Sequence, residues 1–236
     1  MTYRISVDTG GTFTDVVVTD KTGCFTVGKA LTDKKRAFAS ISAALEVASD
    51  ELDISVGDLL RETALFIFGT TRATNGIVER KTARTAFIST EGFPDTLLLK
   101  EGGKSETHNL RIEYPDPYIP RSLTFEVPER ISAEGGIEIP LDETKVTSLL
   151  KTFPEKRIEA IAVCLLWSVA NAVHEKRIAG LIEEILPGIP YTLSSEINPI
   201  LREYRRASST AIDASLNKLG ITKEDPIEHD LLFERF

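Results

Sequence analysis

The first thirty residues alternate between apolar and polar positions. The runs at 3–8 (YRISVD) and 13–20 (FTDVVVTD) are rich in β-branched residues and are separated by two adjacent glycines. This pattern predicts a β-hairpin. A third run at 24–31 (CFTVGKAL) follows a short turn and extends it. Three antiparallel strands are therefore expected first.

The hydrophobic period changes after residue 33. Apolar residues at spacings of three and four predict an amphipathic helix reaching residue 52, with Thr32 or Asp33 as its N-cap. Its stripe consists of Phe38, Ile41, Leu45, Ala48 and Leu52. The elements expected next are a strand at 64–68, a helix-compatible segment at 72–81, a strand at 85–90 and a helix at 94–100.

Residues 101–140 are rich in glycine and proline and break every period. Scattered apolar residues indicate that this stretch is packed: Ile112, Tyr114, Tyr118, Ile119, Leu123, Phe125 and Val127. An α/β alternation then returns, with expected elements at 142–153, 158–167, 170–186, 191–197 and 201–216. The strand at 158–167 is nearly all apolar, which is typical of a strand covered on both faces.

These elements predict an α/β protein in four segments. The expected segments are an N-terminal α/β subdomain at 1–100 carrying the hairpin, an irregular connection at 101–140, a second α/β segment at 141–216 and a C-terminal extension at 217–236. A chain of 236 residues is long enough to bury a substantial core.

Charge and cysteine content exclude several classes of protein. With 28 Lys and Arg against 36 Asp and Glu, the net charge is −8, so neither nucleic acid nor an anionic membrane is an expected partner. The N-terminus lacks the apolar run of a signal peptide, and no stretch reaches the roughly 20 apolar residues of a membrane span. Cys24 and Cys164 form no metal or disulfide pattern. A cytoplasmic location is expected.

The motif DTGGTFTD at 8–15 lies where two predicted strands meet. Gly10 and Gly11 let the backbone approach a ligand closely, and successive N–H groups in such a turn form an anion-binding concavity. Asp8, at the strand end, can hold Mg²⁺ through water. The other polar residues of the motif are Thr9, Thr12, Thr14 and Asp15. The motif predicts a phosphate-binding turn, and the alternative is a plain hairpin with a Gly-Gly turn.

A second candidate anion site follows the strand at 64–68. Gly69, Thr70 and Thr71 lead from the strand into a helix, where free N–H groups and the helix dipole favour an anion. Arg72 adds a fork of donors. The alternative is an N-capping threonine followed by a surface arginine.

Other reactive side chains have ordinary structural explanations. Cys164 lies in an apolar strand and is expected to be a small buried residue, while Trp167 at the end of that strand is expected in the core or an interface. His174 and Glu175 are interpreted as polar residues in the first turn of a helix. Neither His108 nor His229 has a visible ligand partner.

Four motifs together resemble the N-terminal part of the hydantoinase A/5-oxoprolinase family. They are DTGGTFTD at 8–15, GTTRATNGIVERK at 69–81, EGFPDTLLL at 91–99 and SSEINPILREYRRASSTAIDASL at 194–216. The family includes ATP-dependent N-methylhydantoinase and 5-oxoprolinase subunits and the related subunits of acetone and acetophenone carboxylases. Arg205 stands where a glutamate is common, and Asp213 where many members have asparagine. Arg205 and Arg206 therefore have either a role in the site or a place on a solvated helix face.

The resemblance implies one half of a nucleotide-binding fold of the acetate kinase, Hsp70 and actin (ribonuclease H-like) type. Such a fold has a mixed sheet with helices on both faces. By the same resemblance, Asp8 would be the catalytic residue that positions Mg²⁺ or the attacking water, while Gly10, Gly11 and Thr12 would hold the phosphates. The ATP site would also include Thr9, Thr14, Asp15, Gly69, Thr70, Thr71 and Arg72.

The implied activity is the ATP-dependent opening of a cyclic amide through a phosphorylated intermediate. Two alternatives remain: a subunit of an acetone- or acetophenone-type carboxylase, and a non-catalytic assembly or regulatory subunit that retains the fold. ATP and Mg²⁺ are the implied cofactors, and a cyclic amide or a ketone is the implied substrate. Because the superfamily closes its nucleotide between two halves, a HyuB-like subunit or a C-terminal-half partner is expected, in a hetero-oligomer.

Overall fold

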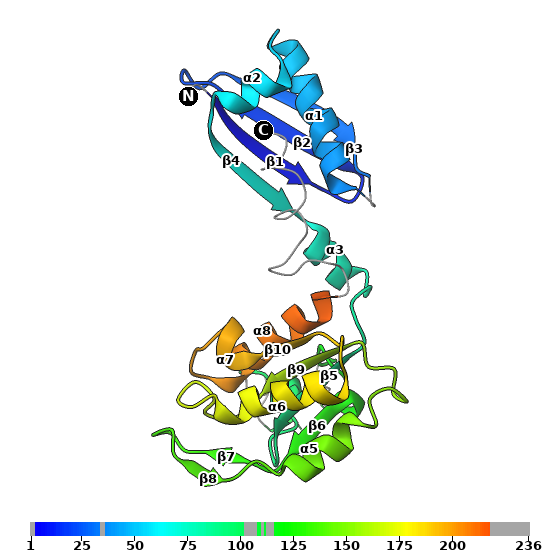
Figure 1. The fold of residues 1–236 in the computed structure, drawn as a ribbon, viewed down its shortest axis with the longest axis vertical. Coiled ribbons are helices and arrows are strands. Elements are labelled where there is room, and N and C mark those ends of the chain that lie inside the picture. The colour runs from blue at the N-terminus through cyan, green and yellow to red at the C-terminus, as the bar shows by residue number, and fades with distance from the viewer. Residues whose placement is uncertain (1–2, 34–35, 102–107, 110, 112–115, 218–236) are drawn as a thin grey trace. The chain divides into compact units, whose positions relative to one another are not determined.

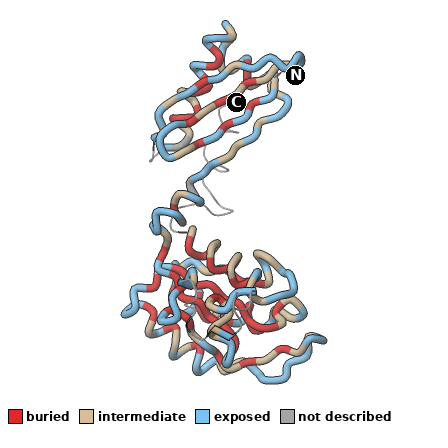
Figure 2. Tube along the Cα trace, turned by 180° about the vertical axis from the view of Figure 1, so that it is seen from behind, coloured by how far each residue is buried: buried red, intermediate tan, exposed pale blue. Residues whose placement is uncertain are grey.

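A computed structural model describes residues 3–33, 36–101, 108–109, 111 and 116–217. Ile112, Tyr114, His229 and nearly all of the expected C-terminal extension lie outside these residues. The chain divides into two compact units between Lys81 and Thr82, and each is described by itself. Buried residues form a separate core in each unit (Figure 2).

The first unit is a four-stranded sheet in the order β3-β2-β1-β4 (Figure 1). As predicted, β1 (Tyr3–Thr9), β2 (Phe13–Thr19) and β3 (Phe25–Leu31) are antiparallel. β4 (Thr63–Thr70) pairs with β1 in the parallel direction. The return to a parallel strand requires a crossover, which α1 (Ala37–Glu51) and α2 (Val56–Arg61) provide.

Helix α1 covers one face of this sheet. Its buried stripe packs on the inward residues of β1 and β2, and this core consists of Ile5, Val7, Val16, Val18, Ile41, Ala44, Leu45, Ala48 and Leu59. The helix begins later than predicted, after Arg36, which makes no side-chain cap bond. Thr32 and Asp33 are therefore not its N-cap: the Thr32 hydroxyl bonds with that of Thr14, and Asp33 accepts the Arg36 amide.

The other face of this sheet is largely exposed, since alternate residues of its strands point away from α1. Its exposed large apolar side chains are Phe13, Phe25, Val27, Leu31, Leu65 and Ile67.

A glycine sets the spacing between α1 and the sheet. A Cβ atom at Gly28 in β3 would lie 1.9 Å from the carbonyl oxygen of Ala44. We expect Gly28→Ala to push the helix off the sheet and to lower the free energy of unfolding by roughly 1–3 kcal/mol, as overpacking does. Urea denaturation of the chain measures this loss.

Gly57→Ala is the matched control for this substitution. A Cβ there would have no neighbour closer than 3.8 Å, and the residue lies in α2, where alanine is the better helix former. This variant should be neutral or slightly stabilising. Equal stability of the two variants would contradict the spacing role of Gly28.

The second unit contains a parallel sheet in the order β10-β9-β5-β6 (Figure 1). Its strands are β5 (Thr85–Thr90), β6 (Thr124–Val127), β9 (Ala160–Cys164) and β10 (Tyr191–Leu193). The units therefore divide before β5, whereas the sequence predicted a first segment extending to residue 100. β5 belongs to the second unit because it pairs with β6 and β9.

Helices cover both faces of this second sheet. α8 (Glu203–Leu216) packs on β9, β10 and β5 and contacts α4 (Thr96–Leu99), while α5 (Glu143–Leu150) and α6 (Val173–Ile185) pack together. Every residue of β9 is buried, as its apolar sequence predicted. The predicted strand at 191–197 ends at residue 193, because the next four residues form α7 (Ser194–Ile197).

The segment predicted to be irregular is partly ordered. It contains a short helix, η1 (Arg121–Leu123), the strand β6 and a hairpin of β7 (Arg130–Ile131) and β8 (Ile137–Ile139). Ile119, Leu123 and Val127 are buried in the core, which confirms that this part of the segment is packed. No described helix is long and apolar enough to cross a bilayer.

Candidate functional site

The turn between β1 and β2 is closed by one backbone hydrogen bond. The Gly10 amide donates to the carbonyl oxygen of Phe13 at 2.9 Å, so Gly11 and Thr12 form the tip. A Cβ atom at Gly10 would lie 3.2 Å from that same oxygen. A side chain at Gly10 would therefore crowd the backbone of the turn, and neither Gly10 nor Gly11 adopts a left-handed φ.

The tip carries two amides that are available to a ligand. Gly11 and Thr12 are exposed, and no described residue accepts a hydrogen bond from either amide. The Thr12 carbonyl oxygen accepts the Thr32 amide at 2.9 Å, which ties the tip to the end of β3. Two adjacent N–H donors on a fixed turn can bind an anion.

The second predicted motif lies beside this turn. In the register of β1 and β4, Asp8 is level with Gly69 and Thr9 with Thr70. The Thr70 hydroxyl donates to the Thr9 carbonyl oxygen at 3.1 Å, and the Thr71 amide approaches the same oxygen at 3.4 Å. Two motifs about sixty residues apart in sequence therefore meet at one end of the sheet.

Helix α3 (Arg72–Val78) begins at this point and brings Asn75 to the turn. A Cβ atom at Gly11 would lie 3.6 Å from Asn75 Nδ2, which also donates to Thr71 Oγ1 at 3.3 Å. The sequence analysis missed Asn75, although its position four residues after Thr71 places both on one helix face. The side chain of Arg72 lies outside the described part of the chain.

The threonines of the motif separate into exposed and buried positions. Thr12 is exposed at the tip, whereas Thr9 and Thr14 face the core. Thr14 is fully buried, and its hydroxyl lies 3.1 Å from that of Thr32. The Thr9 hydroxyl is buried without a hydrogen-bond partner among the described residues. Thr14 therefore faces the interior of the unit, and Thr12 is the threonine on the exposed tip.

The two carboxylates of the motif face each other across β1 and β2. Asp8 and Asp15 are paired in the antiparallel register. Asp15 accepts a hydrogen bond from Lys29 at 2.8 Å, whereas Asp8 is exposed and forms no ion pair among the described residues. Asp8 is therefore the carboxylate available to a cation.

The donor set at Asp8 suits Mg²⁺ better than a metal that needs a protein cage. The described residues contain no cluster of three or more His, Cys, Asp or Glu side chains that could enclose an ion. Mg²⁺ usually takes one or two carboxylates, several waters and the phosphates of its substrate. A single exposed carboxylate beside a turn with two exposed backbone amides fits that arrangement.

The second unit contains a buried polar network that the sequence analysis missed. Glu175 is fully buried and accepts hydrogen bonds from the Leu165 amide, the Ser194 hydroxyl and the Ser195 amide at 2.6–2.9 Å. Arg206, 1% exposed, donates to Leu165 O at 2.7 Å and also to Ser194 Oγ and Ile200 O. Ser194 therefore links two buried charges at the carboxyl end of β9.

A second part of this network joins β5 to α6. Buried Glu129 contacts His174 Nδ1 at 2.8 Å and accepts a hydrogen bond from the Thr90 hydroxyl. The Leu166 amide donates to that same hydroxyl at 3.0 Å. His174 and Glu175 thus lie in the first turn of α6 as predicted, but they face the interior. Glu175 binds the Leu165 amide directly, whereas His174 is linked to the Leu166 amide through Glu129 and Thr90, so both help to fix the chain that follows β9.

Two adjacent arginines have opposite environments. Arg205 is exposed and bonds with Glu101 at 2.8 Å, whereas Arg206 is buried in the network. The solvated-face interpretation therefore applies to Arg205 alone. The helical period of the sequence could have predicted this difference, because Arg206 lies on the same helix face as Thr210 and the buried alanines of α8.

Cys164 is buried, as expected, and its chemistry is suppressed. Removal from water raises the pKa of its thiol to about 11, against the smaller opposing effect of the Arg206 charge. Because the thiolate is the nucleophilic form, this cysteine is inert at neutral pH.

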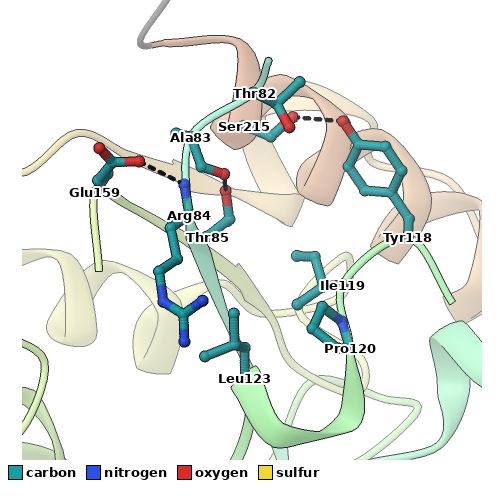
Figure 3. Close-up of a pocket in the computed structure, with 10 residues that line it drawn as sticks. All are labelled: Thr82, Ala83, Arg84, Thr85, Tyr118, Ile119, Pro120, Leu123, Glu159 and Ser215. Atoms are coloured by element: carbon teal, nitrogen blue, oxygen red, sulfur yellow. Dashed lines mark hydrogen bonds between the residues drawn. The ribbon is translucent and has the colours of Figure 1, made fainter. Parts of the chain in front are cut away.

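A small pocket of about 270 Å³ lies where β5 begins (Figure 3). The hydrogen-bonding groups of its wall bond to one another: the Tyr118 hydroxyl lies 2.6 Å from Ser215 Oγ, and the Arg84 amide donates to Glu159 at 2.8 Å. This pocket lies at the amino end of a parallel sheet, whereas ligands of open α/β sheets bind at the carboxyl end. We assign it a structural role.

The hydantoinase/oxoprolinase N-terminal region family matches residues 4–186, and the chain belongs to this family. It is 31% identical to the caprolactamase subunit alpha of Pseudomonas jessenii, over 91% of this chain and 31% of that protein. It is 32% identical to the acetophenone carboxylase gamma subunit of Aromatoleum aromaticum, over 91% of this chain and 31% of that protein.

Solved structures confirm the predicted fold class. The ATP-dependent caprolactamase of Pseudomonas jessenii matches with a TM-score of 0.75 and 30% identity, over 92% of this chain and 32% of that chain. Acetone carboxylase matches with a TM-score of 0.81 and 24% identity, over 93% of this chain and 33% of that chain. The chain therefore has the mixed α/β fold of the N-terminal region of these enzymes and spans about a third of their length.

Proposed function

We propose that this chain is the ATP-binding N-terminal part of an ATP-dependent amidohydrolase that opens a cyclic amide. The observation that carries the proposal is the turn at Gly11 and Thr12, whose two exposed amides lack acceptors among the described residues and lie beside the unpaired carboxylate of Asp8. Phosphates bind to backbone N–H groups, and their charge is balanced by a cation held on a nearby carboxylate.

In the proposed reaction, the Gly11 and Thr12 amides hold the terminal phosphates of ATP. The Thr70 hydroxyl and the Thr71 amide bond to the Thr9 carbonyl oxygen and so hold the turn against β4. The Asn75 side chain lies next to Gly11. The γ-phosphoryl group moves to the amide oxygen and ADP leaves. Water then attacks the amide carbon, and the tetrahedral adduct breaks its ring C–N bond as the nitrogen takes a proton, which leaves an acyl phosphate on the opened chain. A second water hydrolyses this acyl phosphate to the carboxylate and free phosphate. The chain contributes positioning and charge stabilisation.

Asp8 would hold Mg²⁺, directly or through water, and would position it against the phosphates. When bound, the ion neutralises the charge that develops on the transferred group. Asp15 stays with Lys29 and keeps the neighbouring strand in register. Thr9 and Thr14 would support the turn from its buried side, and Gly69 lies level with Asp8 in the register of β1 and β4.

The substrate class is defined by the shared chemistry of the relatives. Caprolactamase and 5-oxoprolinase are named for cyclic amides, whereas acetone and acetophenone carboxylases are named for ketones. Both chemistries can use phosphorylation of an oxygen derived from a carbonyl group. Assays with 5-oxoproline or caprolactam, against acetone or acetophenone with bicarbonate, distinguish amide opening from the carboxylase alternative.

The chain is also proposed to require further polypeptide for turnover, supplied by a C-terminal-half partner or a HyuB-like subunit. It spans 31% of the caprolactamase subunit alpha and 31% of the acetophenone carboxylase gamma subunit, and both are named as subunits. A non-catalytic assembly subunit would need no nucleotide. ATP binding therefore separates that alternative from the proposed enzyme.

Isothermal titration with Mg·ATP, alone and with the partner, tests the proposed function. Gly11→Val should weaken binding about tenfold or more, since a branched side chain blocks access to the tip amides. The fold should tolerate it, because a Cβ at Gly11 makes only an ordinary contact at 3.6 Å.

The control is Gly136→Val, at another exposed turn glycine, where the nearest atom to a Cβ would be 3.4 Å away. It should leave binding unchanged. Absence of Mg·ATP binding by the wild-type chain, both alone and with its partner, would refute the enzyme proposal.

A further inference from the structure

The topology of the second unit creates a crevice between two neighbouring strands. From β5 the chain moves outward to β6, and from β9 it moves in the opposite direction to β10, while β5 and β9 lie side by side. Successive loops therefore leave the carboxyl ends of β5 and β9 toward opposite faces. Open α/β sheets bind their ligands in such a crevice.

A pocket of about 510 Å³ occupies this place. The loop after β5 contributes Phe93 and Leu99, the loop after β9 contributes Trp167, and the start of α8 contributes Tyr204. Its size is within the range of small-molecule sites. The pocket also brings together the segments 91–99 and 194–216, neither of which the phosphate-binding turn uses.

The walls of this pocket combine aromatic surface with two cations, Lys100 and Arg130, and two carboxylates, Asp95 and Glu203. The Arg130 guanidinium lies over the Phe93 ring, 4.9 Å from its centroid, and forms no ion pair with any described carboxylate. Asp95, also in the wall, is paired with Arg121 at 3.3 Å. Phe93 and Leu99 are 42% and 50% exposed, although both are large apolar residues.

The backbone around Trp167 is strained and firmly held. Trp167 has φ 55°, a left-handed conformation that is unfavourable for a bulky side chain. Thr90 accepts the Leu166 amide, and Arg206 donates to the Leu165 carbonyl oxygen, so the preceding residues are fixed by the buried network. Strain that the surrounding structure maintains is a feature of binding sites. Trp167, which the sequence placed in the core or an interface, is half-buried and lines this pocket.

We propose that this pocket binds a small cyclic organic acid, with its ring against Trp167 and Phe93 and its carboxylate on Arg130. An apolar wall accommodates the ring, and a guanidinium pairs with a carboxylate through two parallel hydrogen bonds. The pocket lies in the second unit and the proposed nucleotide site in the first. The choice of probe rests on the proposed function, since 5-oxoproline is a cyclic amide that carries a carboxylate.

Trp167 is the single tryptophan of the chain, so its fluorescence reports on the pocket directly. The chain is titrated without nucleotide with 5-oxoproline, with cyclopentanecarboxylate, which lacks the amide, and with 2-pyrrolidinone, which lacks the carboxylate. Calorimetry provides a second readout. We expect saturable binding of both acids and binding of 2-pyrrolidinone that is weaker by about tenfold or more, as the loss of a charge-assisted hydrogen bond implies.

Arg130→Gln should weaken both acids to the level of 2-pyrrolidinone. Arg157→Gln, at an exposed arginine that does not line the pocket, is the control and should change nothing. Binding of 2-pyrrolidinone as tight as that of the acids, or insensitivity of the acids to Arg130→Gln, would overturn the proposal. No saturable binding of either acid would also overturn it, and would leave the Mg·ATP result unaffected.

Discussion

Arg206→Met should lower the free energy of unfolding by about 3–5 kcal/mol, the range for removing one partner from a buried charged network. The methionine would fill part of the space but would remove the guanidinium donor from the Leu165 and Ile200 carbonyl oxygens and leave Leu165 only the long contact from the Ser168 amide at 3.5 Å. Ser194 would still donate to Glu175, whose negative charge would then be buried without the nearby cation. Urea denaturation of the full chain measures the loss.

Arg205→Met is a closely matched control, since it makes the same chemical change one residue away on the same helix. Arg205 is exposed and pairs with Glu101 at the surface. An exposed ion pair contributes about 0–1 kcal/mol, so this variant should unfold almost as the wild type does. Similar losses for the two variants would show that the buried network does not carry the stability assigned to it.

The second large effect is expected at Asp8. In the assembled enzyme, Asp8→Asn should reduce turnover by roughly 10²–10³-fold, the magnitude seen when one preorganised electrostatic group is lost from a transition state. The measurement is phosphate release with ATP and a cyclic amide. Stability should change little, because Asp8 is exposed and forms no ion pair among the described residues.

Asp15→Asn serves as the comparison for Asp8. The two carboxylates are cross-strand neighbours in the same motif, but Asp15 is engaged by Lys29 at 2.8 Å. Asp15→Asn should therefore have a much smaller effect on turnover. An equal effect of both substitutions, or an unchanged rate for Asp8→Asn, would remove Asp8 from its proposed role.

Local sequence signals were sufficient for the three antiparallel strands of the first unit and for the turn between the first two. Alternation predicted β1, β2 and β3, and the Gly-Gly pair predicted the turn, because both depend on residues that are close in sequence. The start of α1 was misplaced by a few residues, since no side chain caps it. Short elements such as α2 and β6 were missed because six or four residues hold too little of a period.

The sheet to which β5 belongs could not be read from its own residues. Its sequence predicted a buried strand, and all six residues are buried. Its partners, however, are β6 and β9, which follow it in the chain by more than thirty residues. Strand pairing is decided by the surfaces of distant segments, so the boundary between the units emerged only in three dimensions.

The sequence by itself determined the family, the α/β class and the Gly-Gly turn that is proposed to bind phosphate, since short motifs and local periodicity were enough for each. Tertiary structure alone decided which side chains of that motif are exposed: Asp8 is exposed, Asp15 is paired and Thr14 is buried. It also decided that Arg206 is interior and that Trp167 lines a pocket. Burial and pairing are properties of neighbours brought together by folding, and spacing along the chain does not specify them.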